Sequence, residues 1–192
     1  ANFAEFSEAV HVEAAGNVKD LSVVAQHRSA SDVTSVSAGG NIEYVTNSGN
    51  SSLGLAVSGP GRLEVTAGGS IVLKDSRGIV TRGNLDNPFL PEIGASIFAM
   101  AGAKPDYNAF RDYLKVGAEV SDVQLRDHFY TMLRDFGREA VLAETAKAAE
   151  ASYEKGRALV SVLFPKENIS GGDINLFASQ IKTEQGGGID LL

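Results

Sequence analysis

The sequence contains no cysteine and no tryptophan, and only 5 of its 192 residues are proline. Without cysteine there is no disulfide framework and no thiolate zinc site. The low proline content beside 21 glycines excludes collagen and a proline-rich linker, and it favours many tight turns. The absence of cysteine fits a reducing compartment and a secreted protein that avoids thiols equally well, so it does not locate the chain.

The sequence also lacks a long apolar run and an excess of positive charge. No stretch approaches the roughly 20 apolar residues of a membrane-spanning helix, so membrane insertion is not expected. The formal net charge of −7 disfavours nucleic acid and anionic membranes as partners, because both require a positive field. Residues 1–10 include Glu5 and Glu8 but no basic residue, and therefore do not resemble a signal peptide.

A short phrase recurs along the chain: glycine, a small or polar residue, then an apolar, a polar and an apolar residue. It begins at Gly40, Gly61, Gly69 and Gly172, and it returns without the spacer at Gly188. Each copy joins a turn residue that tolerates positive φ to an alternating strand with one buried face. Repetition of such a unit at intervals of a couple of dozen residues or fewer is typical of a solenoid.

Residues 1–103 have the pattern of short β-strands. Alternating runs are expected at 10–14, 18–24, 33–38, 53–57 and 63–67, with a bend at Asp20 and a loop at 47–52. The connections are too short for the helices of βαβ units, which leaves a meandering sandwich or a parallel β-helix. The residues before Ile42 and Leu63 are 62 − 41 = 21 positions apart and share the phrase. We therefore favour stacked β-helix coils.

Residues 104–164 change to a helical pattern. Pro105 and Asp106 predict a helix start, and Gly117 predicts its end. Ser121 then opens a Ser-x-x-Gln sequence, which has the form of a capping box for a second helix. The segment is therefore expected to form a helical hairpin or a three-helix unit.

The rest of this segment predicts a long helical stretch. Residues 139–155 are alanine-rich and strongly favour helix, and Gly156 is expected to kink or divide this helix before Pro165 ends it. Before it, an apolar stripe has helical spacing and consists of Leu125, Phe129, Met132, Leu133 and Phe136. The charged residues expected to lie off this stripe are Arg126, Asp127, Arg134 and Asp135.

The phrase resumes at Gly172, so we predict a mostly β fold with an α-helical insertion. The expected parts are β-helix coils at 1–103, a helical insertion at 104–164 and resumed coils at 165–192. The copies on either side of the insertion are expected to stack as neighbours, with the helices projecting from that seam. An apolar last strand without a cap further predicts a fragment of a longer solenoid. The residues expected inside the stack are Ile42, Leu63, Val65, Ile71, Leu73, Ile174 and Leu176.

Two blocks of sequence resemble a known family. Residues 58–69 (Ser-Gly-Pro-Gly-Arg-Leu-Glu-Val-Thr-Ala-Gly-Gly) with 78–84, and residues 170–183 with 186–191, resemble the large exoproteins of the filamentous-haemagglutinin type. The helical stretch that ends in Leu-Phe-Pro at 163–165 fits the same family. The resemblance implies an internal or C-terminal segment of a secreted, right-handed parallel β-helix. The family's amino-terminal secretion domain and any toxin domain have no counterpart in these residues.

The resemblance also implies a role at the surface of a Gram-negative bacterium. Such proteins are exported by two-partner secretion through an outer-membrane partner transporter and act as adhesins or as stalks for a toxin. We therefore expect a non-enzymatic structural or adhesive segment without a cofactor. Its helical insertion is the expected contact surface for a receptor or glycan on a host or neighbouring cell. A passive stalk of a contact-dependent toxin is an alternative.

The three histidines do not predict a metal site. His11, His27 and His128 are not arranged in an H-E-x-x-H or comparable ligand spacing. His11 falls on the polar phase of its strand and should be solvated. His27 opens a polar connection over residues 27–32, and His128 lies beside the apolar stripe.

A β-helical carbohydrate-active enzyme is the alternative of another class. Polysaccharide lyases and hydrolases on this fold place acids and bases on successive coils, and one region of this chain is rich in both. A general acid/base pair requires a geometry that a sequence does not show. A solvated turn explains such a cluster of charged residues equally well. The residues concerned are Lys74, Asp75, Arg77, Arg82 and Asp86.

Aromatic residues in the helical segment offer either a core or a binding surface. Their helical spacing favours a core. An exposed apolar patch of a few hundred Å² would instead mark a partner site. The set is Tyr107, Phe110, Tyr113, Phe129 and Phe136.

Overall fold

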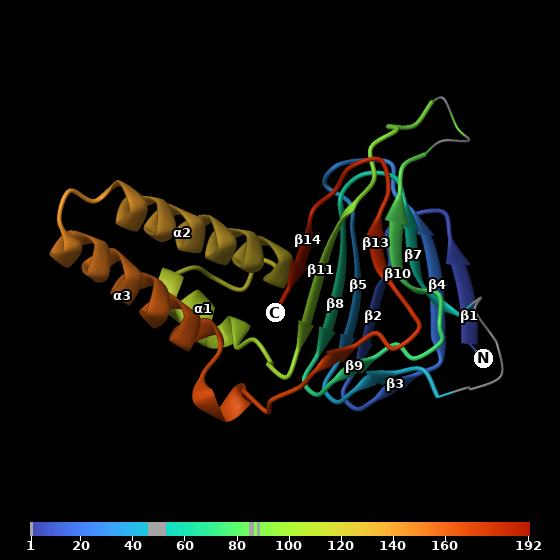
Figure 1. Cartoon of the computed structure of the whole chain (residues 1–192), viewed down its shortest axis with the longest axis horizontal. Helices are drawn as coiled ribbons and strands as arrows, with labels where there is room; N and C mark the ends of the chain where they lie inside the picture. The colour runs from blue at the N-terminus through green and yellow to red at the C-terminus, as the bar shows by residue number, and fades with distance from the viewer. Residues whose placement is uncertain (1, 46–52, 85–86, 88) are drawn as a thin grey trace. The chain divides into compact units, whose positions relative to one another are not determined.

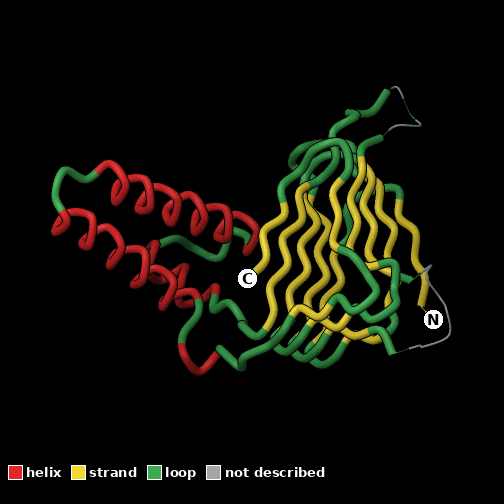
Figure 2. The backbone as a smooth tube through the Cα atoms, viewed as in Figure 1, coloured by secondary structure: helices red, strands yellow, loops and turns green. Residues whose placement is uncertain are grey.

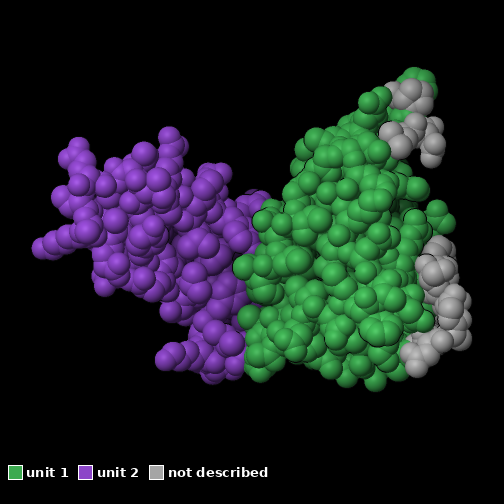
Figure 3. Space-filling view, in the orientation of Figure 1, with its two compact units in different colours: residues 1–103, 170–192 green, residues 104–169 purple. Residues whose placement is uncertain are grey.

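The structure is a computed structural model that describes residues 2–45, 53–84, 87 and 89–192. The chain forms two compact units (Figure 3). Residues 1–103 and 170–192 make the first, which we call the solenoid unit, and residues 104–169 make the second, the helical unit. Each unit is described by itself.

The solenoid unit consists of three parallel sheets that the chain visits in turn (Figures 1 and 2). Sheet A contains β1 (Asn2–Phe6), β4 (Leu21–Gln26), β7 (Gly54–Ser58), β10 (Gly78–Arg82) and β13 (Ile181–Thr183). Sheet B contains β2 (His11–Ala14), β5 (Val33–Ala38), β8 (Arg62–Ala67), β11 (Ser96–Ala101) and β14 (Ile189–Leu191). Sheet C contains β3 (Val18–Lys19), β6 (Ile42–Glu43), β9 (Ile71–Val72) and β12 (Ile174–Asn175).

Strands of successive coils pair in a repeating parallel register, as in a β-solenoid. In sheet C, Ile42 pairs with Val18 on one side and with Ile71 on the other, and Ile71 pairs with Ile174. The last phrase before the helices and the first one after them are therefore neighbours, as predicted. A meandering sandwich is excluded because every strand pair of the described residues is parallel.

The copies of the phrase do not all occupy the same place in the coil. The copy that begins at Gly61 forms β8 in sheet B, whereas the copies at Gly40 and Gly69 lead into sheet C. The interval of 21 residues is therefore not a coil length. Equivalent corner residues are 24 residues apart from Asn17 to Asn41 and 29 apart in the next step.

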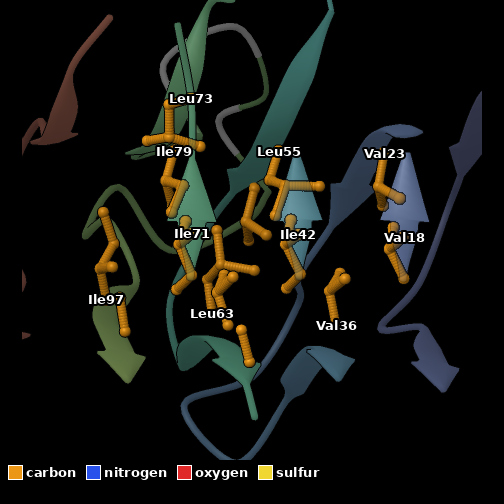
Figure 4. Close-up of a cluster of buried hydrophobic side chains, with 14 of the residues drawn as sticks. Val18, Val23, Val36, Ile42, Leu55, Leu63, Ile71, Leu73, Ile79 and Ile97 are labelled. Atoms are coloured by element: carbon orange, nitrogen blue, oxygen red, sulfur yellow. The ribbon is translucent and has the colours of Figure 1, made fainter. Parts of the chain in front are cut away.

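The core of the solenoid unit is a stack of aliphatic side chains between the sheets (Figure 4). Its predicted inward residues Ile42, Leu63, Val65, Ile71 and Leu73 are buried. Ile174 and Leu176 belong to the last coil and are half-buried against the same core. Full burial of a branched aliphatic side chain contributes about 1.5–3 kcal/mol, so this stack is the main source of stability in the unit.

The corner between sheets B and C explains why the phrase begins with glycine. The Asn17 Oδ1 atom accepts the backbone N–H of Asn41 at 2.8 Å, and Asn41 Oδ1 accepts that of Ser70 at the same distance. A Cβ atom at Gly40 would lie 2.1 Å from Asn17 Oδ1, and one at Gly69 would lie 2.1 Å from Asn41 Oδ1. The glycines leave room for this ladder of side chains between coils.

Two further turns were predicted in the solenoid unit, and the structure describes one of them. Asp20 adopts a φ of 49° between β3 and β4, so the predicted bend is confirmed. The loop predicted at 47–52 lies outside the described residues.

The helical unit contains α1 (Tyr107–Leu114), α2 (Asp122–Leu142), α3 (Ala146–Leu163) and a short 3-10 helix (Lys166–Asn168). Asp106 caps α1 by accepting the Ala109 N–H at 2.9 Å, and the capping box at Ser121 is confirmed. The predicted end at Gly117 is wrong. α1 ends earlier because Lys115 adopts a left-handed conformation, with a φ of 56°, and bonds to the last carbonyls of the helix.

Residues 139–155 are helical as expected except at 143–145, where the stretch is divided. α2 ends at Leu142, and Thr145 starts α3 by accepting the Ala148 N–H on its hydroxyl at 3.2 Å. A threonine N-cap satisfies an amide of the new helix, so the chain can turn back inside an alanine-rich stretch. Gly156 does not divide α3, which continues to Leu163, just before Pro165 as predicted.

The helices bury a core of their own. Phe110, Leu125, Phe129, Leu159 and Leu163 are buried, and the ring of Phe129 lies edge-on to that of Phe110 with 6.0 Å between centroids. Core packing is thus confirmed for Phe110 and Phe129, whereas Tyr107 is only half-buried and Tyr113 is exposed. Arg126 was expected off the stripe but is buried, because a long side chain next to Leu125 can lay its apolar stem along the core.

None of the helices in residues 2–45, 53–84, 87 and 89–192 combines the length and apolar character needed to cross a bilayer.

Candidate functional site

Two grooves on the described surface are candidates for binding, one in each unit. The first, which we call the helical groove, lies between α2 and α3 and has a volume of about 570 Å³. Its lining is mainly apolar, with the aromatic rings of Phe136 and Tyr153 and the side chain of Val160. The lining residues are Leu133, Phe136, Gly137, Ser152, Tyr153, Gly156, Arg157, Val160 and Ser161.

Two glycines inside helices shape the helical groove. Glycine in a helix interior costs about 1 kcal/mol relative to alanine. Packing does not require either residue to be glycine: a Cβ at Gly137 meets nothing within 4 Å, and one at Gly156 lies 3.5 Å from Leu133 Cδ1, an ordinary contact. What these glycines provide is open space in the groove.

Charged side chains border the helical groove. The ammonium of Lys155 lies 5.7 Å from the ring centroid of Phe136 and 3.5 Å from Glu139 Oε2. Arg157 lines the groove and pairs with Glu150. The groove thus has paired charges at its rim and an apolar floor, as many protein interfaces do.

The second groove, which we call the sheet C groove, lies on the outer side of the last two coils. Its lining is Val72, Lys74, Asp75, Asn175 and Phe177, and its volume is about 570 Å³. Val72 pairs with Asn175 in the register of β9 and β12, so the groove crosses the strand pair that joins the chain before and after the helical unit.

Two residues with a left-handed backbone conformation place their side chains in the sheet C groove. Lys74 and Phe177 occupy equivalent positions two residues after this pair, with φ values of 47° and 51°. The Lys74 carbonyl accepts the Ala178 N–H at 3.0 Å, which holds the two corners together. Phe177 is 85% exposed, so its ring contributes little to the core.

The polar cluster predicted from the sequence is only partly assembled. Lys74 and Asp75 line the sheet C groove, whereas Arg77 and Arg82 do not, and Asp86 lies outside the described residues. A hydrogen bond from Lys182 is the main cause that lowers the pKa of Glu184, and the charges of Arg82 and Arg77 lower it further. Glu184 pairs with Lys182, and the two arginines act on Glu184 only through their charge.

His27 is buried in a hydrogen-bonded corner between sheets A and B. Its Nδ1 lies 2.6 Å from the Pro60 carbonyl, which only accepts, so this nitrogen carries the proton. The Thr34 hydroxyl therefore donates to Nε2 at 2.8 Å and accepts the Val10 N–H at 3.3 Å. Burial lowers the pKa of His27, against smaller raising effects from Pro60 and from the charge of Asp32. The ring is thus neutral and structural.

The polar connection predicted for residues 27–32 is therefore buried at its first residue. Thr34, which bonds to His27, pairs in register with the inward Leu63. A polar residue at an inward position was therefore the sequence signal for a buried polar partner. The other two histidines are exposed, as expected for His11, whose Nδ1 lies 2.7 Å from Ser35 Oγ.

The described part of the chain brings no three His, Asp or Glu side chains together in a way that would hold a metal ion. No protein-family model, no curated protein and no solved structure matches this chain. The function is therefore argued from the fold and from the two grooves.

Sequence reasoning missed two of the residues that matter most here. Phe177 follows the inward Leu176, so an aromatic residue at an outward position was a signal available in the sequence. Gly137 is the second. Its place on the wall of a groove follows from the position of the turn between α2 and α3, which the sequence does not reveal.

Proposed function

We propose that the chain is a non-enzymatic structural and adhesive segment of a secreted exoprotein of the filamentous-haemagglutinin type. The observation that carries this proposal is the resumption of one parallel register across the helical unit, from Ile71 to Ile174. A solenoid that tolerates an insertion without losing register suits a stalk, because each coil contacts only its neighbours. The parent protein would be exported by a partner transporter and act at the surface of a Gram-negative bacterium.

We further infer that the solenoid is a right-handed β-helix. Connections between parallel strands of one sheet are right-handed in the great majority of cases, and successive strands of each sheet here are joined through the other two sheets.

The helical groove is the contact surface that we assign to adhesion. It combines exposed Tyr153 and Val160 with an apolar floor, and Val141 and Leu142 lie exposed at the end of α2. Loops and insertions of a solenoid carry binding more often than its coils do. The occupant would be a receptor on a host or neighbouring cell.

Adhesion is tested with beads that carry the purified chain, applied to cultured epithelial cells and to Gram-negative bacteria. The wild-type chain should retain beads on at least one of these surfaces, and Gly137→Leu should abolish retention by filling the groove. Ala151→Leu adds the same side chain to an exposed position of α3 outside the lining and should retain beads like the wild type.

Two outcomes contradict this assignment. If wild-type beads bind no better than albumin beads, the segment is a passive spacer or toxin stalk. If Gly137→Leu binds like the wild type, the helical groove is not the contact surface.

A carbohydrate-active enzyme is the second candidate, and the sheet C groove favours it because Lys74 and Asp75 share one lining. A lyase or hydrolase would release reducing ends or unsaturated uronates from acidic or neutral polysaccharides. Turnover that Lys74→Ala or Asp75→Ala abolishes would replace the structural proposal, whereas an inactive wild-type chain rejects the enzyme.

A further inference from the structure

The sheet C groove has the composition of a sugar-binding site. Phe177 is one of two phenylalanines among the described residues that are strongly exposed, the other being Phe89. Phe177 lines a groove together with a cation, a carboxylate and an amide. An exposed ring that is fixed by its backbone position, rather than by burial, is available to a ligand.

The chemistry of these side chains suits the apolar face and the hydroxyl-bearing edge of a pyranose. The ring of Phe177 offers a flat apolar surface for the C–H face of a sugar. The Asp75 carboxylate accepts hydrogen bonds, the Lys74 ammonium donates them, and the Asn175 amide does both. Hydroxyl groups around the edge of a sugar ring require this mixture of donors and acceptors.

Charge decides between a neutral saccharide and an anionic one. Lys74 and Asp75 carry opposite charges in one groove, so their sum gives no field that would attract a polyanion. The net charge of −7 on the whole chain also repels a polyanion. The groove therefore favours a neutral hexose chain over a polyuronate.

We propose that the sheet C groove is a non-catalytic binding site for a neutral saccharide, in which the ring of Phe177 stacks on a pyranose. Lys74, Asp75 and Asn175 orient that sugar by hydrogen bonds to its hydroxyl groups. The site lies entirely in the solenoid unit and does not depend on the helical groove.

Isothermal titration calorimetry of the whole chain tests this with cellohexaose, mannohexaose and xylohexaose, and with hexagalacturonate as the anionic probe. At least one neutral hexasaccharide should bind, with an affinity that salt leaves unchanged. Phe177→Ala should weaken binding by about tenfold or more, and Phe177→Tyr should stay within about threefold of the wild type. Phe89→Ala, the matched control at a residue that is 93% exposed, should bind like the wild type.

The proposal is overturned if none of the neutral probes binds, if hexagalacturonate binds more tightly than all of them, or if Phe177→Ala binds like the wild type. Circular dichroism of each variant separates a lost contact from a lost fold. Gly137→Leu should leave saccharide binding unchanged, so failure of the adhesion proposal and failure of this one give different results.

Discussion

At the scale of single residues, the space between coils decides which side chains the corners accept. Gly16 and Gly40 hold the same position in successive coils, each one residue before an asparagine of the ladder. A Cβ at Gly40 would lie 2.1 Å from Asn17 Oδ1, whereas a Cβ at Gly16 meets nothing within 4 Å. The same residue at the same corner is thus required in one coil and optional in the other.

We therefore expect opposite effects from one substitution at these two glycines. Gly40→Ala should lower the free energy of unfolding by about 1–3 kcal/mol, because the methyl group displaces the Asn17 side chain and its hydrogen bond. Gly16→Ala should be neutral or stabilise by up to about 1 kcal/mol. Urea denaturation followed by circular dichroism measures both, and equal effects would contradict the ladder geometry.

His27 makes the stability of the chain depend on pH. Burial lowers its pKa in the folded state below the ordinary value of 6.5, so the unfolded chain takes up a proton that the folded chain refuses. Its contribution is complete above pH 6.5 and is lost as the pH falls below that value, by at most about 1.4 kcal/mol per pH unit.

Denaturation curves between pH 7.5 and pH 5, which is above the range where Asp32 titrates, should show this loss. His27→Gln should remove most of the slope and cost about 1–3 kcal/mol at pH 7.5, since Pro60 or Thr34 loses its partner. His11→Gln, at an exposed position, should keep the slope. A wild-type chain whose stability is flat over this range would show that His27 is not held neutral.

At the scale of elements, the burial of a strand position determines how much a charged side chain placed there lowers the stability of the fold. Leu63 is buried in β8, and Leu63→Asp should lower stability by more than about 4 kcal/mol and leave the chain unfolded or aggregated. Ile174→Asp should cost less, because this residue of β12 is half-buried and its carboxylate reaches water. Asn175→Asp, on the outer side of the same strand, is the matched control and should melt like the wild type. Thermal melts followed by circular dichroism rank the three.

The sequence predicted the coils better than it predicted the helices. Alternation places Ile42, Ile71 and Leu73 correctly because a residue spacing of two fixes the side of a strand. The sheet to which each copy belongs could not be predicted in this way. The copy at Gly61 forms a strand of sheet B but has the same pattern as the copies that lead into sheet C. The turn at Thr145 was hidden because helix propensity in an alanine-rich stretch outweighs a single capping residue.

The two grooves were still harder to predict. A groove needs two elements side by side, and its walls come from residues far apart in sequence, such as Lys74 and Asn175. Lys74 and Asp75 were found as charged neighbours. Phe177 and Gly137 were not, because an outward aromatic residue does not by itself reveal the groove beside it, and nothing local marks an unfilled space.

At the scale of the whole molecule, the parallel sheets predict a gradient of local stability. β5 and β8 have neighbours on both sides in sheet B, whereas β2 and β14 lie at its ends. A strand with one neighbour opens more easily, because fewer contacts hold it.

Hydrogen exchange followed by nuclear magnetic resonance should reveal this gradient. Amides of β8, such as that of Val65, should be the most protected, and protection should fall toward β2 and β14. Uniform protection across the four strands would mean that the solenoid unit opens all at once and would contradict coil-by-coil stability.

The hydrogen bond from the Lys104 N–H to the Asn168 carbonyl, at 2.9 Å, brings the two ends of the helical unit together. It has a consequence for the order of assembly. Contacts such as that between Gly83 and Gln185 join residues 102 positions apart, and closing a flexible loop of that length is slow and entropically costly. A helical unit that folds first shortens this loop to (104 − 83) + (185 − 168) = 38 residues, which reduces the closure cost by about 1 kcal/mol. Early folding of the helical unit during synthesis would therefore favour docking of the last coil.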